Sequence, residues 1–393
     1  MTSCCPPLPS AFSVLLLVGV LTVSANAQSP GSPRTWTSSD GKKIEAILID
    51  ADASTVALKT AAGLFKLPVS RLSAEDQAYL TTWRGQAPQK LAPWPEKVET
   101  TGDLKIEEKE IGEEFSYFSP HFEFRSPLRL SNSVVREFAR LFEATYEGVK
   151  ALPVGFDPMP PQEGGHFLTK LFANREAYFA AGGLPGSGGM FSSVSRGREF
   201  VSGSISVPLT SLGVEQVGNR YIIDPDKDSG TLVHEITHQV AVMWGIYGAP
   251  IWFTEGIAEY MQSAPYSKGT MRFSNMTGNV EKTVMERANG NEFQMLPVEK
   301  LMTISREEWA NLLVNGDAAK NYHSANVLMT YFLHLDGSGT GEAVAAYLRD
   351  LRAGTDSRQA AATHLLRDRD LPKLAADVRE KWRQNGFRLE YAP

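Results

Sequence analysis

The segment His234-Glu235-Ile236-Thr237-His238 contains residue types at a spacing suited to chemistry at a metal ion. It lies in a stretch with strong helical character, and positions i and i+4 of a helix lie on the same face. His234 and His238 can therefore direct two imidazoles to one metal ion. Glu235 is displaced by about 100° around the helix axis, so it can reach a water beside the metal but is not an equivalent ligand. The motif predicts a metal site with Glu235 as general base.

A third ligand is expected from the next apolar helical stretch, residues 251–260, which contains Glu255 and Glu259. A catalytic zinc site uses three protein ligands and keeps one position for water. The spacing after His238 allows the first helix to end, a turn over 245–250, and a second helix to return antiparallel. Glu255, near the start of that helix, then faces the histidines. Glu259 lies one turn later on the same face, where it either holds the second ring nitrogen of a histidine or is a solvated helix residue.

The motifs H-E-I-T-H and W-F-T-E-G-I-A-E-Y resemble those of the gluzincin metallopeptidases, the peptidase MA-like group related to thermolysin and the neutral aminopeptidases. The resemblance implies a zincin-like domain, one Zn²⁺ held by His234, His238 and Glu255, and hydrolysis of peptide or protein substrates. In the aminopeptidase relatives a tyrosine at the start of a later helix stabilises the oxyanion, and Tyr322 is the matching position. The alternative for Tyr322 is an aromatic residue that packs on the core.

Two functions follow, and they belong to different classes. The first is a secreted zinc metallopeptidase. The second is a non-catalytic binding or structural protein that combines an SH3-like module with a metal-binding zincin-like fold. The intact metal motif favours catalysis, because a degenerate domain would usually have lost one of its residues. A strand over 199–209, upstream of the metal helix, is expected to be an edge strand to which an extended peptide could pair. Four other histidines have no ligand-like spacing and are expected to be structural or solvated: His121, His166, His334 and His364.

The N-terminal residues 1–27 are predicted to be a signal peptide. Residues 11–23 are apolar but shorter than the roughly 20 residues that span a bilayer, and Ala25-Asn26-Ala27 has the small-x-small cleavage pattern. Cleavage leaves no stable membrane span, whereas the lack of Lys or Arg before the apolar run leaves an uncleaved anchor as the alternative. Both cysteines precede the run, so the mature chain has none. Export without disulfides favours a bacterial periplasm or exterior.

Residues 34–84 are predicted to form a small unit with strands at 44–49, 55–59 and 64–69 and a closing helix over 73–83. The motifs R-T-W-T-S-S-D-G-K and L-P-V-S-R-L-S-A-E-D-Q-A-Y-L resemble the Sla-type homology domain of the SH3-like class. The resemblance implies a small β-barrel that binds a protein or surface partner. The alternative is a spacer unit that has its own packed core and no binding role.

The proline-rich residues 85–102 are predicted to be a linker to a domain over 103–393. Strands are expected over 117–124 and 167–172, a long helix over 132–152 and a short one over 175–181. The predicted fold class is α+β, with a small barrel followed by a domain that has an upstream sheet and a largely helical C-terminal half. The 393 residues have a formal net charge of −6 and no basic run, which argues against a nucleic-acid partner.

Overall fold

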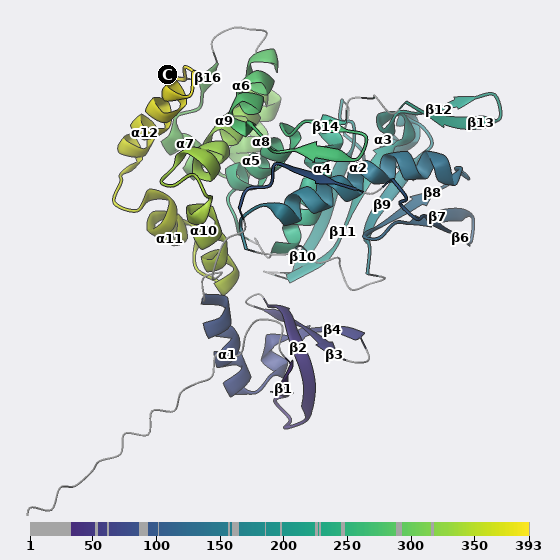
Figure 1. Ribbon diagram of the computed structural model, residues 1–393, viewed down its shortest axis with the longest axis horizontal. Helices are drawn as coiled ribbons and strands as arrows, with labels where there is room; N and C mark the ends of the chain where they lie inside the picture. The colour runs from purple at the N-terminus through teal and green to yellow at the C-terminus, as the bar shows by residue number, and fades with distance from the viewer. Residues whose placement is uncertain are drawn as a thin grey trace, which may run out of the picture.

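Two units follow each other along the chain, and each combines a sheet with helices (Figure 1). The computed structural model describes residues 33–51, 54–60, 63–85, 93–100, 102–155, 158, 165–184, 186–196, 199–224, 227, 229–244, 248–287, 293–315 and 318–392. The predicted α+β class is confirmed by this combination of elements. The predicted signal peptide lies outside the described residues.

The N-terminal unit is an open sheet of four antiparallel strands followed by a helix. Its elements are β1 (Pro33–Thr37), β2 (Lys43–Ala51), β3 (Thr55–Thr60), β4 (Gly63–Pro68), the 3-10 turn η1 (Val69–Arg71) and α1 (Ala74–Gly85). The three predicted strands and the closing helix are confirmed, and Trp36, Leu58 and Leu80 are fully buried between them. The strand order is β1-β2-β3-β4.

The small β-barrel predicted for this unit is not closed within the described residues. Within the described residues β1 pairs only with β2 and β4 only with β3, so both are edges of the sheet. A single bridge, between Ser38 and Leu72, links the end of β1 to the segment after β4. Closure needs the first and last strands to pair along their length, and here the chain passes from β4 directly into η1.

Part of the predicted linker belongs to the larger unit. The small sheet β14-β15-β5 consists of β14 (Tyr266–Ser267), β15 (Thr270–Arg272) and β5 (Lys97–Glu99). The linker predicted over 85–102 therefore contains a strand whose antiparallel partner comes from much later in the chain. The indole N–H of Trp94 also donates to the carbonyl of Gly339, at 3.0 Å. The larger unit thus begins before residue 103.

A mixed six-stranded sheet precedes the metal-motif helix, in the order β10-β11-β9-β8-β7-β6. Its strands are β6 (Glu107–Ile111), β7 (Glu114–Phe118), β8 (Phe122–Ser126), β9 (Phe167–Phe172), β10 (Met190–Arg196) and β11 (Glu199–Pro208). The strand predicted over 117–124 is instead the hairpin β7–β8, because the chain turns where the Ser119 N–H donates to the Phe122 carbonyl. The predicted strand over 199–209 is β11, but the edge strand is β10.

Helices cover this sheet and form the C-terminal half, as predicted (Figure 1). They are α2 (Asn132–Ala151), α3 (Arg175–Ala180), α4 (Gly230–Ala241), α5 (Ile251–Gln262), α6 (Met276–Arg287), α7 (Val298–Thr303), α8 (Arg306–Asn315), α9 (Ala318–Thr330), α10 (Glu342–Ala353), α11 (Ser357–Ala361) and α12 (Leu371–Gln384). Helices α2 and α4 contact each other and the sheet, and α5 packs between α4 and α9. The helices predicted over 132–152 and 175–181 are α2 and α3. None of the described helices is long and apolar enough to cross a membrane.

Short turns and hairpins complete the larger unit. The 3-10 turns are η2 (Leu209–Leu212) and η3 (Val242–Trp244), and η4 (Tyr331–Leu335) and η5 (Ala362–Leu366) are π-helical segments that follow α9 and α11. The remaining strands are β12 (Val214–Val217), β13 (Arg220–Ile223), β16 (Gln294–Met295) and β17 (Glu390–Tyr391). Strands β12 and β13 form a hairpin, which projects at the upper right of Figure 1.

One buried arginine joins the two units. The guanidinium of Arg352, on α10, donates to the carbonyl of Trp244 at 2.9 Å and to the carbonyl of Ala51 at 3.2 Å. Trp244 ends the turn η3, which follows the metal-motif helix, and Ala51 ends β2 of the N-terminal sheet. The side chain of Arg352 thus connects the N-terminal sheet to the end of the metal-motif helix.

Candidate metal centre

Helix α4 presents the two histidines of the motif on one face. Its apolar residues Leu232, Ile236 and Val240 are buried at helical spacing, which fixes the rotation of the helix against the core. His234 and His238 then lie one turn apart, and their Nε2 atoms are 3.0 Å apart. The predicted helical context of the motif is confirmed.

Helix α5 brings the third predicted ligand to the histidines. Glu255 lies in the second turn of α5, and its Oε2 atom is 3.2 Å from Nε2 of His234 and 3.2 Å from Nε2 of His238. Gly256 allows this placement, because a Cβ atom at that position would lie 2.8 Å from the carbonyl oxygen of Ala325 on α9. The absence of a side chain therefore permits α5 and α9 to pack closely beside the site.

The three donor atoms fit a single tetrahedral metal ion. His234, His238 and Glu255 each offer one ligand atom, and these atoms lie within 4.8 Å of one another. A tetrahedral zinc site with bonds of about 2.0–2.1 Å separates its ligand atoms by about 3.3 Å. The observed separations of 3.0 to 3.2 Å are close to that value. Two imidazoles and one carboxylate also match the donor set of catalytic zinc sites.

Glu259 lies behind the His234 ring, away from the three donor atoms. Its Oε1 atom is 3.1 Å from Nδ1 of His234, which is an ion-pair distance rather than hydrogen-bond geometry. Only 4% of Glu259 is exposed, so the alternative of a solvated helix residue is wrong. The carboxylate touches the ring nitrogen that faces away from Glu255.

The two carboxylates make the centre favourable for positive charge. Burial lowers the pKa of His234, but the carboxylates of Glu255 and Glu259 outweigh burial and raise that pKa to about 10. Burial raises the pKa of Glu255, but His238 and His234 hold it well below the ordinary glutamate value. A buried charge needs a compensating partner. The cluster thus favours a positive charge, which a protonated imidazole or a bound metal ion would supply.

Glu235 lies outside the donor cluster but beside it. The backbone N–H of Phe191, on the edge strand β10, donates to Oε2 of Glu235 at 2.7 Å. Glu235 is half-buried and lines the same cleft as the two histidines. This contact fixes the carboxylate between the metal-motif helix and the sheet edge, as a positioned base requires. The sequence gives no sign of the Phe191 contact, because it joins a loop-flanked strand to a distant helix.

Tyr322 projects from α9 into the cleft. Its ring centroid lies 5.9 Å from that of His234 and 5.5 Å from that of Trp309, with edge-to-face geometry in both cases. Burial, followed by the carboxylates of Glu255, Glu259 and Glu235, raises the pKa of Tyr322 well above its ordinary value. The hydroxyl is therefore protonated at neutral pH and can donate a hydrogen bond.

These side chains line one open cleft of about 520 Å³. The cleft wall opposite the metal-motif helix is the edge strand β10, which contributes Met190, Phe191, Ser193 and Ser195. Arg306, from the first turn of α8, also lines it. Sequence reasoning missed Phe191 and Arg306. A Ser-x-x-Glu signature at the start of α8 is visible in the sequence, but nothing in it predicts that this helix end reaches the cleft.

The remaining histidines contact structural partners elsewhere. His121 Nδ1 is 2.6 Å from Glu143 Oε2, and His364 Nε2 is 2.8 Å from Asp350 Oδ2. The rings of His166 and Phe118 meet edge to face, His334 forms a hydrogen bond with Tyr260, and His323 packs near Phe293. None of these contacts lies in the donor cluster, in agreement with the prediction for the four histidines without ligand-like spacing.

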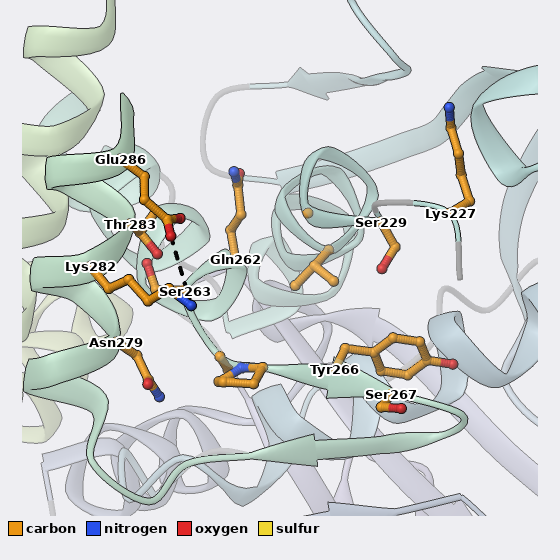
Figure 2. A pocket seen from close by; sticks show the side chains of 14 residues that line it. Lys227, Ser229, Gln262, Ser263, Tyr266, Ser267, Asn279, Lys282, Thr283 and Glu286 are labelled. Carbon is orange, nitrogen blue, oxygen red and sulfur yellow. Dashed lines mark ion pairs between the residues drawn. The ribbon is translucent and has the colours of Figure 1, made fainter. Parts of the chain in front are cut away.

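A second pocket, of about 370 Å³, lies at the opposite ends of α4 and α5. Figure 2 shows hydroxyl and amide side chains around it and an ion pair between Lys282 and Glu286, at 3.7 Å. Among its described lining residues Glu286 is the only one of a common metal-ligand type. The chemistry expected from the sequence thus belongs to the cleft that contains the donor cluster.

Comparison with known proteins finds no relative of this chain. The chain matches no protein-family model, no curated protein and no solved structure. The functional assignment therefore depends on the donor cluster, the neighbouring carboxylate and the cleft.

Proposed function

We propose that this protein is a zinc metallopeptidase that hydrolyses peptide bonds. His234, His238 and Glu255 would hold one Zn²⁺, and Glu235 would act as general base. The observation that supports this most directly is the spacing of the three donor atoms, 3.0 to 3.2 Å, at the end of a cleft that also contains a carboxylate outside the cluster. That combination of ligands and free base suits hydrolysis by an activated water.

The residues of the cleft divide the reaction between them. Zinc, when bound, supplies a water whose pKa is lowered toward about 7 and polarises the substrate carbonyl. Glu235, held by the Phe191 N–H, takes a proton from the attacking water and returns it to the leaving amine. The protonated hydroxyl of Tyr322 donates a hydrogen bond to the carbonyl oxygen as negative charge develops there.

The edge strand β10 offers a binding surface for an extended peptide. Within the described residues its only strand partner is β11, and its other side lines the cleft. Because strand residues alternate, Ser193 has the same orientation as Phe191, whose N–H points into the cleft toward Glu235. A substrate chain that adds to this edge would have its backbone alongside the base.

We also propose that the larger unit is a gluzincin-type, zincin-like domain and that the N-terminal sheet with α1 is related to SH3-like modules. The His-Glu-x-x-His helix followed by a glutamate helix supports the first relation, and the short strands with a terminal helix support the second. The N-terminal unit would then bind a protein or surface partner. The apolar run at 11–23, and the lack of cysteine after residue 5, support export to a bacterial periplasm or exterior.

Metal analysis and a peptide digest test the proposed activity together. We expect residues 28–393 to contain about one zinc per chain and to cleave a mixed peptide library. A chelator should stop cleavage and added zinc should restore it. Stoichiometric zinc without cleavage of any library member would reject the peptidase and favour the alternative, a metal-containing binding or structural protein.

A further inference from the structure

Arg306 is the basic residue of the cleft. Among the described residues that line the cleft, it is the only lysine or arginine, and the two lining carboxylates, Glu235 and Glu255, belong to the metal centre. Most of the other lining residues are apolar or carry hydroxyl groups. Apart from the metal centre, the guanidinium is therefore the one charged group among the described residues of the cleft lining.

The helix that carries Arg306 does not account for its charge. Helix α8 begins with a reciprocal cap, in which the Ser305 N–H donates to Glu308 at 2.9 Å and the Glu308 N–H donates to Ser305 Oγ at 3.1 Å. Arg306 is the first residue of the helix. A positive side chain there is unfavourable, because the N-terminal end of a helix already has a partial positive charge. Helix stability alone would favour an acidic or neutral residue.

Among the described residues, no acidic side chain neutralises Arg306. In the part of the chain that the structure describes, no carboxylate forms an ion pair with its guanidinium. Glu308, two residues later, accepts hydrogen bonds from Ser305 instead. The Arg306 side chain is exposed, so its hydrogen-bond donors face the solvent of the cleft.

The packing of α8 places Arg306 on the lining of the cleft that contains Tyr322. Trp309 lies three residues later, on the same side of the helix, and its ring contacts the ring of Tyr322 edge to face at 5.5 Å. Trp309 is buried, with 3% of its surface exposed, so this contact fixes the start of α8 against α9. Arg306 is thereby placed on the side of the cleft that contains Tyr322.

We infer that Arg306 determines substrate specificity by binding a carboxylate of the peptide. This inference rests on the proposed peptidase function. The planar guanidinium can hold a carboxylate through two parallel hydrogen bonds. The carboxylate comes either from an acidic side chain near the scissile bond or from the C-terminus of the peptide. Either source would be drawn into the cleft and held in register beside Tyr322.

Peptide binding to a catalytically silent form tests this inference. The protein used is the zinc-loaded Glu235→Gln variant, and the probes are four fluorescent hexapeptides of alanine and phenylalanine. They carry a single glutamate or glutamine and end in a carboxylate or an amide. We expect one carboxylate-bearing form to bind about ten- to a hundredfold more tightly than its neutral counterpart. Adding Arg306→Gln should remove this difference and leave binding of the fully neutral peptide unchanged.

Two further variants separate recognition from unspecific charge effects. Arg306→Lys should keep part of the preference, because it keeps the charge but not the paired hydrogen bonds. Arg220→Gln removes an exposed arginine on the β12–β13 hairpin, outside the cleft, and should keep all of it. Equal binding of all four peptides, or a preference that survives Arg306→Gln, would overturn the inference. The unmutated protein could also cleave none of the peptides while a preference for the carboxylate-bearing peptide still depends on Arg306. That result would support the inference and reject only the proposed hydrolysis.

Discussion

Glu259 and His234 are in contact through the ring nitrogen that faces away from the donor cluster, with 3.1 Å between Oε1 and Nδ1. The other ring nitrogen of His234 lies 3.2 Å from Glu255. One imidazole is thus held between two carboxylates on the same helix, one turn apart. The first carboxylate is in position to share a metal ion with the ring, and the second to orient the ring.

This arrangement predicts different results for two conservative substitutions. Glu255→Gln should abolish stoichiometric zinc binding, because it removes the charge of a ligand. Glu259→Gln should weaken zinc binding by about 10–100-fold, because only the orientation and basicity of His234 change. Zinc titration of both variants measures the difference. If Glu259→Gln empties the site and Glu255→Gln does not, the two roles are reversed.

Glu235→Gln should keep the zinc and lose the activity. Glutamine retains an oxygen that can accept the Phe191 N–H, so the cleft geometry is preserved, but it cannot take a proton. We expect kcat to fall by about 10²–10⁴-fold with an unchanged zinc content. Glu342→Gln, at an exposed position on α10, is the matched control and should retain full activity. Near-native turnover by Glu235→Gln would show that another group is the base.

Tyr322→Phe distinguishes an oxyanion donor from a packing residue. The substitution removes the hydroxyl but keeps the ring that meets Trp309 and His234. We expect kcat to fall by about 10²–10³-fold, as for the loss of one oxyanion donor, with little change in melting temperature. A lowered melting temperature with unchanged kcat would instead assign Tyr322 to the core.

His334 is expected to make folding stability depend on pH. Burial lowers its pKa to about 4, from an ordinary value of 6.5, and its Nε2 lies within hydrogen-bond distance of the Tyr260 hydroxyl, at 2.8 Å. Between pH 6.5 and 4 the unfolded chain binds a proton that the folded chain does not, so stability falls as the pH falls through this window. The loss is at most about 3 kcal/mol.

Urea unfolding at pH 6.5 and pH 4.5 measures this effect. The unmutated protein should lose more stability between the two values than His334→Gln, which has no proton to exclude. The same loss in both proteins would assign the pH dependence to other groups.

The local parts of the fold and the site could be predicted from the sequence. Helix α2 shows its apolar period in Val135, Phe138 and Phe142, all of which are buried. The placement of His234 beside His238 follows from helix geometry, without knowledge of the rest of the fold. The prediction succeeds where all the residues that form the pattern lie in one helix or strand.

Pairings between distant elements could not be predicted in this way. Strand β5 has only three residues, and its partner β15 follows much later, so the segment resembles a proline-rich linker. Strand β10 alternates weakly because serines occupy many of its positions, and the position of residues 199–209 upstream of the metal-motif helix alone predicts the edge strand there. The N–H of Phe191 and the guanidinium of Arg306 reach the cleft only through such pairings and packing.

The contacts of Arg352 have a consequence for how the protein melts. Its guanidinium bonds both to Ala51, in the N-terminal sheet, and to Trp244, just after the metal-motif helix. A shortened chain that starts after α1 would lose the Ala51 acceptor, and a hydrogen bond to a charged group contributes about 1.5–3 kcal/mol. The N-terminal sheet is therefore not expected to unfold independently. Heating should disrupt it and the metal centre in one shared transition.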